Sequence, residues 1–167
     1  YARPQATLNR VMEFTGPGVS TLSMDERATL ANMATECTPR SGIVSADAET
    51  HRWIAQWRPG VDQDRLRART VEPDADAVYA GGIHVIDLAA LVPMVADPGD
   101  PDRGIASDPT NGAKVADIGE VRIDIAYGGS CTAGKIDDLV FYHRVAKEAV
   151  EAGRKVAPGV DFIIQCG

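Results

Sequence analysis

Long apolar runs are missing from this sequence, and none approaches the roughly 18 residues that a membrane-spanning helix needs. The first residues, Tyr1 to Gln5, are followed by no apolar core of the kind found in secretory signals. Cysteine is also scarce, with 3 residues at widely separated positions, Cys37, Cys131 and Cys166. An odd, scattered set makes no disulfide framework and is typical of a reducing compartment. We therefore expect a cytoplasmic protein with no export signal and no membrane span.

Basic clusters are lacking as well. The chain has 17 Lys and Arg against 24 Asp and Glu, a formal net charge of −7, and no stretch concentrates enough positive charge to neutralise a phosphate backbone. A nucleic-acid partner is therefore not expected. No internal repeat is present. With 167 residues the chain corresponds to one ordinary domain or two small ones. It starts without Met and stops in an apolar stretch, residues 162–167, so we expect an internal fragment of a longer protein.

Strand-like and helix-like segments alternate, which predicts an α/β layer architecture. The strongest element is a helix over residues 24–37. Ser23 to Glu26 has the S-x-x-E form of a capping box, and Pro39 prevents continuation. A short strand over residues 41–44 and a second helix over residues 47–57 follow, and residues 61–77 are expected to be irregular.

The second half contains a βαβ pattern. Residues 82–88 are predicted to be a strand, and residues 92–113, rich in Pro, Gly and Asp, a connection between two sub-domains. A strand over residues 121–127, a glycine-rich turn and a helix over residues 136–152 then lead to a strand over residues 160–165. These last two strands should be parallel, with a right-handed crossover.

The glycine-rich turn, Gly128 to Lys135, carries Cys131 at the carboxyl end of a strand, where ligands of α/β units gather. A cysteine close to the start of a helix meets unpaired amide groups, which favour the thiolate that attacks substrates or binds metals. A small buried structural cysteine is an equally good interpretation. The same segment nearly matches a phosphate-binding P-loop, but Ile136 stands where the magnesium-binding Ser or Thr belongs.

One face of the helix over residues 24–37 is unusual. Leu30, Met33, Ala34 and Cys37 form an ordinary core stripe, whereas the other face places small uncharged residues around Asn32 and Glu36. Such a face is typical of close packing with one carboxylate available, although a solvated Glu is the commoner situation. No two histidines have a metal-binding spacing. We expect His51 on a helix surface, His84 in the core, His143 on a packed side, and Trp53 and Trp57 as a packing pair.

Together these segments resemble the large-subunit family of aconitase and 3-isopropylmalate dehydratase. The likeness runs in the family's order from about residue 11 to residue 162. It is carried by Gly16-Pro17-Gly18-Val19, Leu22-Ser23-Met24-Asp25-Glu26-Arg27-Ala28-Thr29-Leu30, Asn32-Met33-Ala34-Thr35-Glu36, Ser41-Gly42-Ile43-Val44, Ile86-Asp87-Leu88 with Pro93, and Gly129-Ser130-Cys131-Thr132.

The resemblance implies a three-layer α/β/α fold with a mainly parallel sheet, made of parts of two aconitase-like sub-domains. Residues 1–92 would be the later part of the second domain, and residues 93–167 a linker and the first half of the third. It also implies an iron–sulfur hydro-lyase that dehydrates and rehydrates a 2-hydroxy di- or tricarboxylic acid. Three cysteines of such enzymes hold a [4Fe–4S] cluster whose unligated iron is a Lewis acid.

By this likeness Cys131 would be a cluster ligand, flanked by Ser130 and Thr132 in the cofactor-binding loop. Asn32 would lie near the cluster sulfurs and Glu36 near the substrate hydroxyl. The implied partners are a small hydroxy-carboxylic acid, the remaining large-subunit domains and a small swivelling subunit or domain.

Departures from the family pattern leave alternatives open. Ala133 replaces an Asn, neither Cys37 nor Cys166 matches a ligand position, and the family's downstream C-x-x-C pair is absent, so we expect this chain by itself to be inactive. A truncated, non-catalytic scaffold domain without a cluster is the second hypothesis. A nucleotide-binding module is the third.

Overall fold

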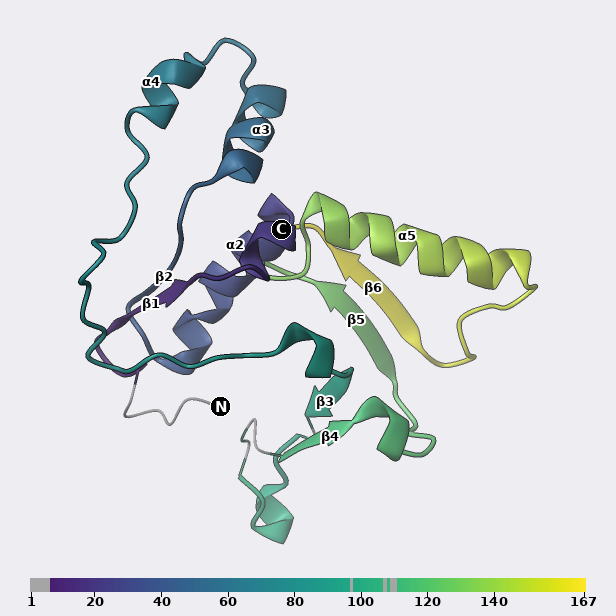
Figure 1. Cartoon of the computed structure of the whole chain (residues 1–167). Coiled ribbons are helices and arrows are strands. Elements are labelled where there is room, and N and C mark those ends of the chain that lie inside the picture. Colours follow the sequence, from purple (N-terminus) through teal and green to yellow (C-terminus); the bar gives the residue numbers. More distant parts are fainter. Residues whose placement is uncertain (1–6, 97, 107, 109–110) are drawn as a thin grey trace. The chain divides into compact units, whose positions relative to one another are not determined.

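A computed structural model describes residues 7–96, 98–106, 108 and 111–167. It divides into two compact units, Tyr1–Ile83 with Ile125–Gly167, and His84–Asp124, and each is considered by itself. Helices alternate with strands, and two of the three strand pairs are parallel (Figure 1). The α/β class predicted from the sequence is confirmed.

The first parallel pair encloses a helix. Strand β1 (Val11–Phe14) pairs with β2 (Ser41–Val44), and α2 (Met24–Met33) lies between them in the chain (Figure 1). A methyl group on Gly42 would lie 2.8 Å from the Cβ of Ala34, which is itself buried, so a glycine at this place in β2 permits close contact with the end of α2.

The start of α2 is as predicted, but its end is not. The Glu26 amide donates to the Ser23 hydroxyl (3.3 Å) and the Ser23 amide donates to the Glu26 carboxylate (2.8 Å), which completes the capping box. The helix expected to reach residue 37 ends at Met33. The chain then tightens into the 3₁₀ turn Thr35–Cys37, and Thr38 adopts a left-handed conformation (φ 72°) that terminates the helical path.

The next segment is more helical than predicted. Helix α3 (Ala48–Trp57) is capped by Asp47, and the rings of Trp53 and Trp57 have centroids 6.2 Å apart, which confirms the packing pair. A short helix, α4 (Gln63–Arg67), lies where irregular chain was expected. It forms because the Asp62 carboxylate accepts the amides of the first turn, a cap that the sequence pattern contained.

The βαβ pattern of the second half is confirmed. Strand β5 (Ile125–Gly129) pairs in parallel with β6 (Asp161–Gln165) across helix α5 (Ile136–Glu151), with Gly128 opposite Ile164. The first strand begins four residues later than the predicted 121. A methyl group on Gly128 would lie 3.1 Å from the Tyr142 ring, so α5 covers this face closely. His143, expected on the packed side of the helix, is exposed.

The strand predicted over residues 82–88 is wrong. These residues belong to no strand, His84 is exposed rather than in the core, and the chain enters the 3₁₀ turn Leu88–Ala90 instead. Alternating apolar residues form a strand only beside a neighbour, and no strand pairs with them in the described chain. Within the expected connection, β3 (Met94–Ala96) and β4 (Gly112–Lys114) form an antiparallel pair. Residues 97, 107, 109 and 110 of that connection lie outside the description.

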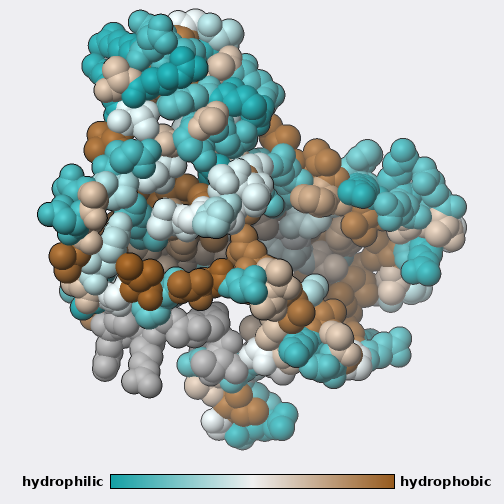
Figure 2. Space-filling model, viewed as in Figure 1, coloured by the Kyte–Doolittle hydropathy of each residue, from teal (hydrophilic) through white to brown (hydrophobic). Residues whose placement is uncertain are grey.

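Much of the apolar surface is uncovered. Figure 2 shows hydrophobic residues on the surface of the face in view. Met33, assigned to a core stripe, is 46% exposed, and large apolar side chains of β5, α5 and β6 are exposed too, among them Tyr127, Phe141 and Phe162. Of the helices in the described residues, none has the length and apolarity needed to cross a membrane.

Candidate functional site

The loop that carries Cys131 is shaped by backbone geometry. Gly129 ends β5 with φ +117°, and a methyl group there would lie 2.0 Å from the carbonyl oxygen of Gln165. Ser130 follows with φ +74°, uncommon for a residue with a side chain, and its amide donates to that same Gln165 oxygen (3.3 Å). The chain therefore turns sharply across the end of β6. Such strained residues are frequent at functional sites.

The other side of the loop closes on the same strand end. The Gly167 amide donates to the carbonyl of Gly134 (2.9 Å), and a methyl group on Gly134 would lie 2.4 Å from the Gly167 nitrogen. Cys131 lies between these contacts with its thiol free and exposed. It precedes the first residue of α5, Ile136, by five positions. It therefore lies in the glycine-rich turn before the helix, as the sequence pattern predicted.

Lys135 is engaged within its own turn. Its ammonium donates to the carbonyl of Thr132 (2.5 Å) and pairs with Asp138 (3.1 Å). In a P-loop the corresponding lysine reaches for phosphate oxygens. The geometry thus gives the nucleotide-binding hypothesis no support.

Helix α2 lies against the Cys131 loop. The Asn32 side-chain amide donates to the carbonyl of Cys131 (3.1 Å), and the Thr29 hydroxyl lies 3.1 Å from the carbonyl of Thr132. The sequence predicted a packed polar face on this helix. The structure shows that two residues of that face meet the loop, about a hundred positions further along the chain.

Glu36 lies beyond the end of α2, in the 3₁₀ turn Thr35–Cys37. It is exposed, and within the described residues its carboxylate makes no hydrogen bond or ion pair. The structure brings Asn32 to the Cys131 loop. Because the chain tightens after Met33, it leaves Glu36 one turn further on, with a carboxylate that can accept a proton or a hydrogen bond.

Arg27, which sequence reasoning missed, is the main electrostatic anchor of α2. It is 2% exposed and binds the Asp47 carboxylate through both terminal nitrogens (2.6 and 2.9 Å). It also donates to the carbonyls of Val19 and Leu22 (both 3.1 Å). The hydrogen bond from Arg27 lowers the pKa of Asp47 to about 2, against an opposing effect of burial. The sequence did contain a signal for this ion pair. Arg27 is followed by Ala, Thr and Leu, and an aspartate stands at the cap of the next helix.

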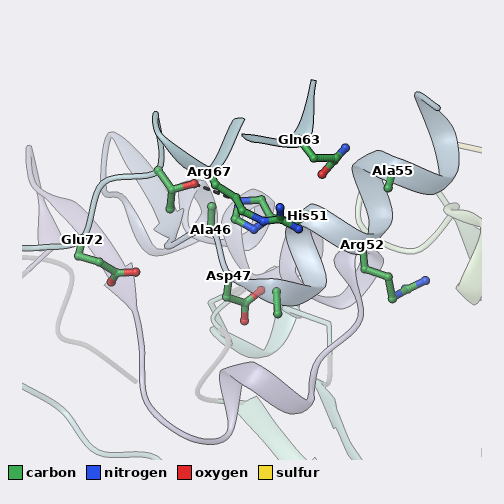
Figure 3. Close-up of a pocket in the computed structure, with 10 residues that line it drawn as sticks. Ala46, Asp47, His51, Arg52, Ala55, Gln63, Arg67 and Glu72 are labelled. Atoms are coloured by element: carbon green, nitrogen blue, oxygen red, sulfur yellow. Dashed lines mark hydrogen bonds between the residues drawn. The ribbon is translucent and has the colours of Figure 1, made fainter. Parts of the chain in front are cut away.

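A hollow of about 620 Å³ lies between α3 and α4 (Figure 3). Most of its charged and polar groups have partners: Asp47 binds Arg27, His51 Nε2 lies 3.0 Å from the Thr70 hydroxyl, Arg52 binds Glu49 and Arg67 binds Asp64, whereas Glu72 pairs with none of the described residues. His51, expected on a helix surface, lines this hollow. Most of the charge that lines the hollow is therefore already neutralised within the protein.

The donors for a metal are incomplete in the described part of the chain. It contains no group of three or more His, Cys, Asp or Glu residues placed to hold a metal ion. Cys37 is half-buried in the turn after α2, and Cys166 is exposed directly after β6. Cys131 is thus a thiol that can supply one ligand of a larger set.

Comparisons with known proteins identify relatives over the whole described chain. A model of the aconitase family (aconitate hydratase) matches residues 2–167. The chain is 41% identical over 154 residues to the 3-isopropylmalate dehydratase large subunit of Clostridium kluyveri, covering 92% of this chain and 32% of that protein. It is 34% identical over 157 residues to the same subunit of Aquifex aeolicus, covering 94% and 33%.

A mitochondrial protein is also among the relatives. The chain is 37% identical over 175 aligned residues to the mitochondrial homoaconitase of Eremothecium gossypii, covering 94% of this chain and 24% of that protein. The chain therefore spans about a third of the length of the dehydratase subunits and about a quarter of this homoaconitase.

Proposed function

Because this chain belongs to the aconitase family, we propose that it forms the part of a hydro-lyase that carries Cys131, Asn32 and Glu36. The reaction is the dehydration and rehydration of a 2-hydroxy di- or tricarboxylic acid, similar to isopropylmalate or aconitate. The observation that carries the proposal is the hydrogen bond between the Asn32 amide and the Cys131 carbonyl. This bond joins α2, which carries the expected polar face, to the loop that carries the expected cluster ligand.

The cysteine loop fits an iron–sulfur ligand. Cys131 is exposed on a backbone turn that Gly129 and Gly134 hold against β6, with Ser130 and Thr132 on either side. We assign Cys131 as one thiolate ligand of a [4Fe–4S] cluster, with the other two thiolates supplied by residues outside this sequence. When bound, such a cluster supplies a Lewis-acidic iron that polarises a hydroxyl or carboxylate of the substrate.

The chain's own polar groups have separate roles in this proposal. Asn32 fixes the Cys131 carbonyl and so orients the thiol-bearing loop. Glu36 has an exposed carboxylate that pairs with none of the residues the structure describes, and we assign it to hold the proton that moves with the substrate hydroxyl. Because most of the ligand set and the carboxylate-binding residues lie elsewhere, the 167-residue chain would be inactive by itself.

The expected surroundings of the site are part of the proposal. Residues 1–92 would belong to the second aconitase-like domain and residues 93–167 to the linker and third domain, in a cytoplasmic protein. The remaining large-subunit domains and a small swivelling subunit or domain would complete the site. The relatives supporting this are named large subunits of a dehydratase.

Cluster reconstitution tests the proposal. The complete protein, treated anaerobically with iron and sulfide, should become brown, and Cys131→Ala should remain colourless. Cys166→Ala is the matched control, because Cys166 is also exposed and lies beside the same strand end, yet it should retain the colour. A colourless parent protein would favour the non-catalytic scaffold, and a brown Cys131→Ala variant would remove this residue from the ligand set.

A further inference from the structure

The first turns of α2 and α5 exchange hydrogen bonds. The Asp25 carboxylate, in the first turn of α2, accepts the amide of Asp137 (3.0 Å), in the first turn of α5. In return, the hydroxyl of Ser23, the cap of α2, donates to the Asp137 carboxylate (2.7 Å). Asp25 of α2 thus caps an amide at the start of α5, and Asp137 of α5 binds the hydroxyl that caps α2, across more than a hundred residues of sequence.

The bond to Asp25 satisfies a backbone amide of α5 that the helix cannot satisfy itself. The first amides of an α-helix have no partner within the helix, and a carboxylate near them is favourable because of their partial positive charge. The side chains of Ser23, Asp25 and Asp137 are all half-buried, so water replaces these bonds less readily than at an open surface. The contact fixes the C-terminal end of the segment 130–137.

Thr29 and Asn32 fix the other end of that segment. One turn after Asp25, the Thr29 hydroxyl lies 3.1 Å from the carbonyl of Thr132 and 3.1 Å from that of Asp25 in its own helix, so the two carbonyls share its single proton. The Asn32 side-chain amide donates to the carbonyl of Cys131. All of these contacts are polar and none depends on a large apolar side chain. The position of the Cys131 loop beside α2 is therefore set by directional hydrogen bonds, which specify geometry more narrowly than apolar contact.

We propose that Asp25 and Thr29 are positioning residues, which hold the Cys131 loop at a fixed place beside Asn32. The inference rests on the proposed function where it concerns the cluster, but its first test does not. Neither residue touches the thiol. Each acts through the backbone of the segment 130–137.

Amide hydrogen exchange of the complete protein in its cluster-free form tests the contact directly. In Asp25→Ala, exchange within residues 130–138 should accelerate by roughly 10-fold, the size expected for a lost helix cap, while the later turns of α5 keep their rates. Asp25→Asn retains an acceptor oxygen and should restore most of the protection. Thr29→Val should accelerate exchange around residues 132–134 by a smaller factor.

Glu26→Ala is the matched control. It removes a capping interaction of α2 itself, the bond from the Ser23 amide, but no contact with α5. It should accelerate exchange at the start of α2 and leave residues 130–138 unchanged. Unaltered exchange in Asp25→Ala, or equal acceleration in Glu26→Ala, would overturn the proposal.

Cluster retention is the second readout. In the reconstituted protein, chelator-driven loss of the visible absorption should be roughly 10-fold faster in Asp25→Ala, as for other residues that support a metal ligand indirectly, and near the parent rate in Asp25→Asn. Equal retention in all three proteins would contradict a positioning role. A parent protein that binds no cluster would refute the proposed function, while the exchange experiment would still decide whether the loop is anchored.

Discussion

At the scale of single residues, Arg27 is the side chain on which α2 most depends. Its guanidinium is buried and joins the turn before the helix to the cap of α3 through Asp47. Removing one partner of a buried ion pair leaves the other uncompensated. We expect Arg27→Ala to lower the free energy of unfolding by about 3 kcal/mol, measured by denaturant titration. Arg52→Ala, which breaks a solvent-screened pair with Glu49, should cost much less. Similar losses would contradict the special position of Arg27.

The ion pair between Arg27 and Asp47 predicts that the free energy of unfolding depends on pH. The pKa of Asp47 is lowered from 3.8 to about 2, chiefly by the hydrogen bond from Arg27. The unfolded state therefore binds the proton more tightly, so this stabilisation is complete above about pH 4 and is lost as pH falls toward about 2. Because 37% of the Asp47 side chain is exposed, solvent screening limits the effect to about 1 kcal/mol.

Denaturant titrations of the parent protein and of Asp47→Asn at a series of pH values would measure this contribution of Asp47 to stability. The stability difference between the parent and Asp47→Asn should shrink across that acidic interval, while other carboxylates titrate equally in both proteins. A constant difference would show that Asp47 does not provide this pH dependence.

Glu36 provides a prediction about rate. If its carboxylate handles the substrate proton, Glu36→Gln should slow turnover of the complete enzyme by ~100-fold or more, within the range for a lost acid–base group. The visible absorption of the cluster should be unchanged, because the variant keeps every thiol. Steady-state kinetics with matched cluster content would decide, and an undiminished kcat would take Glu36 out of the mechanism.

At the scale of elements, the corner between β5 and α5 depends on one glycine. Gly16 and Gly129 have similar backbone angles, φ +104° and +117°, but Gly16 has open space where a methyl group would stand, whereas Gly129 has the Gln165 carbonyl 2.0 Å away. Gly16→Ala should cost only backbone strain, about 1 kcal/mol, and Gly129→Ala at least ~3 kcal/mol. Measuring the free energy of unfolding of the two variants distinguishes the cost of backbone strain from the cost of a steric clash. Equal costs would mean that the corner can shift to accept a side chain.

Elements with a local physical cause were predictable from the sequence. The capping box at Ser23 determines where α2 begins. The alternation around Ile125 and the apolar stretch around Ile163 identified two strands of a βαβ unit. The two wrong predictions concern features that the local pattern does not determine. Residues 82–88 have strand composition but no neighbour in the described chain, and the end of α2 depends on a change to 3₁₀ geometry that Pro39 only bounds from outside.

At the scale of the whole molecule, exposed apolar surface is the most prominent property of this chain. Val145 of α5 is 67% exposed and Ile125 of β5 is 60% exposed. Apolar surface of this extent is typical of faces that other protein covers. We expect the 167-residue chain in isolation to bind a hydrophobic dye strongly and to self-associate, whereas a protein of the relatives' length should bind little. Fluorescence titration of both would show this, and weak dye binding by the isolated chain would contradict it.

The candidate site was predictable only in its parts. Cys131 was found because glycines surround it, and Asn32 because its helix face is short of charge. Their hydrogen bond, and the links from Asp25 and Thr29, join residues about a hundred positions apart, which no local pattern specifies. The role of each residue in catalysis stays a prediction.

The contact between Gly134 and Gly167 implies an order of events on the ribosome. The turn around Cys131 is held by the amide of Gly167 and the carbonyl of Gln165, both of which are synthesised later than the turn itself. At about 5–20 residues per second, a nascent chain needs roughly 2–7 s to extend from the thiol to the glycine that secures it. During that interval the cysteine is tethered but not yet placed. If Cys131 is a cluster ligand, as proposed, metal loading in the cell should follow translation of β6 and not accompany emergence of the thiol.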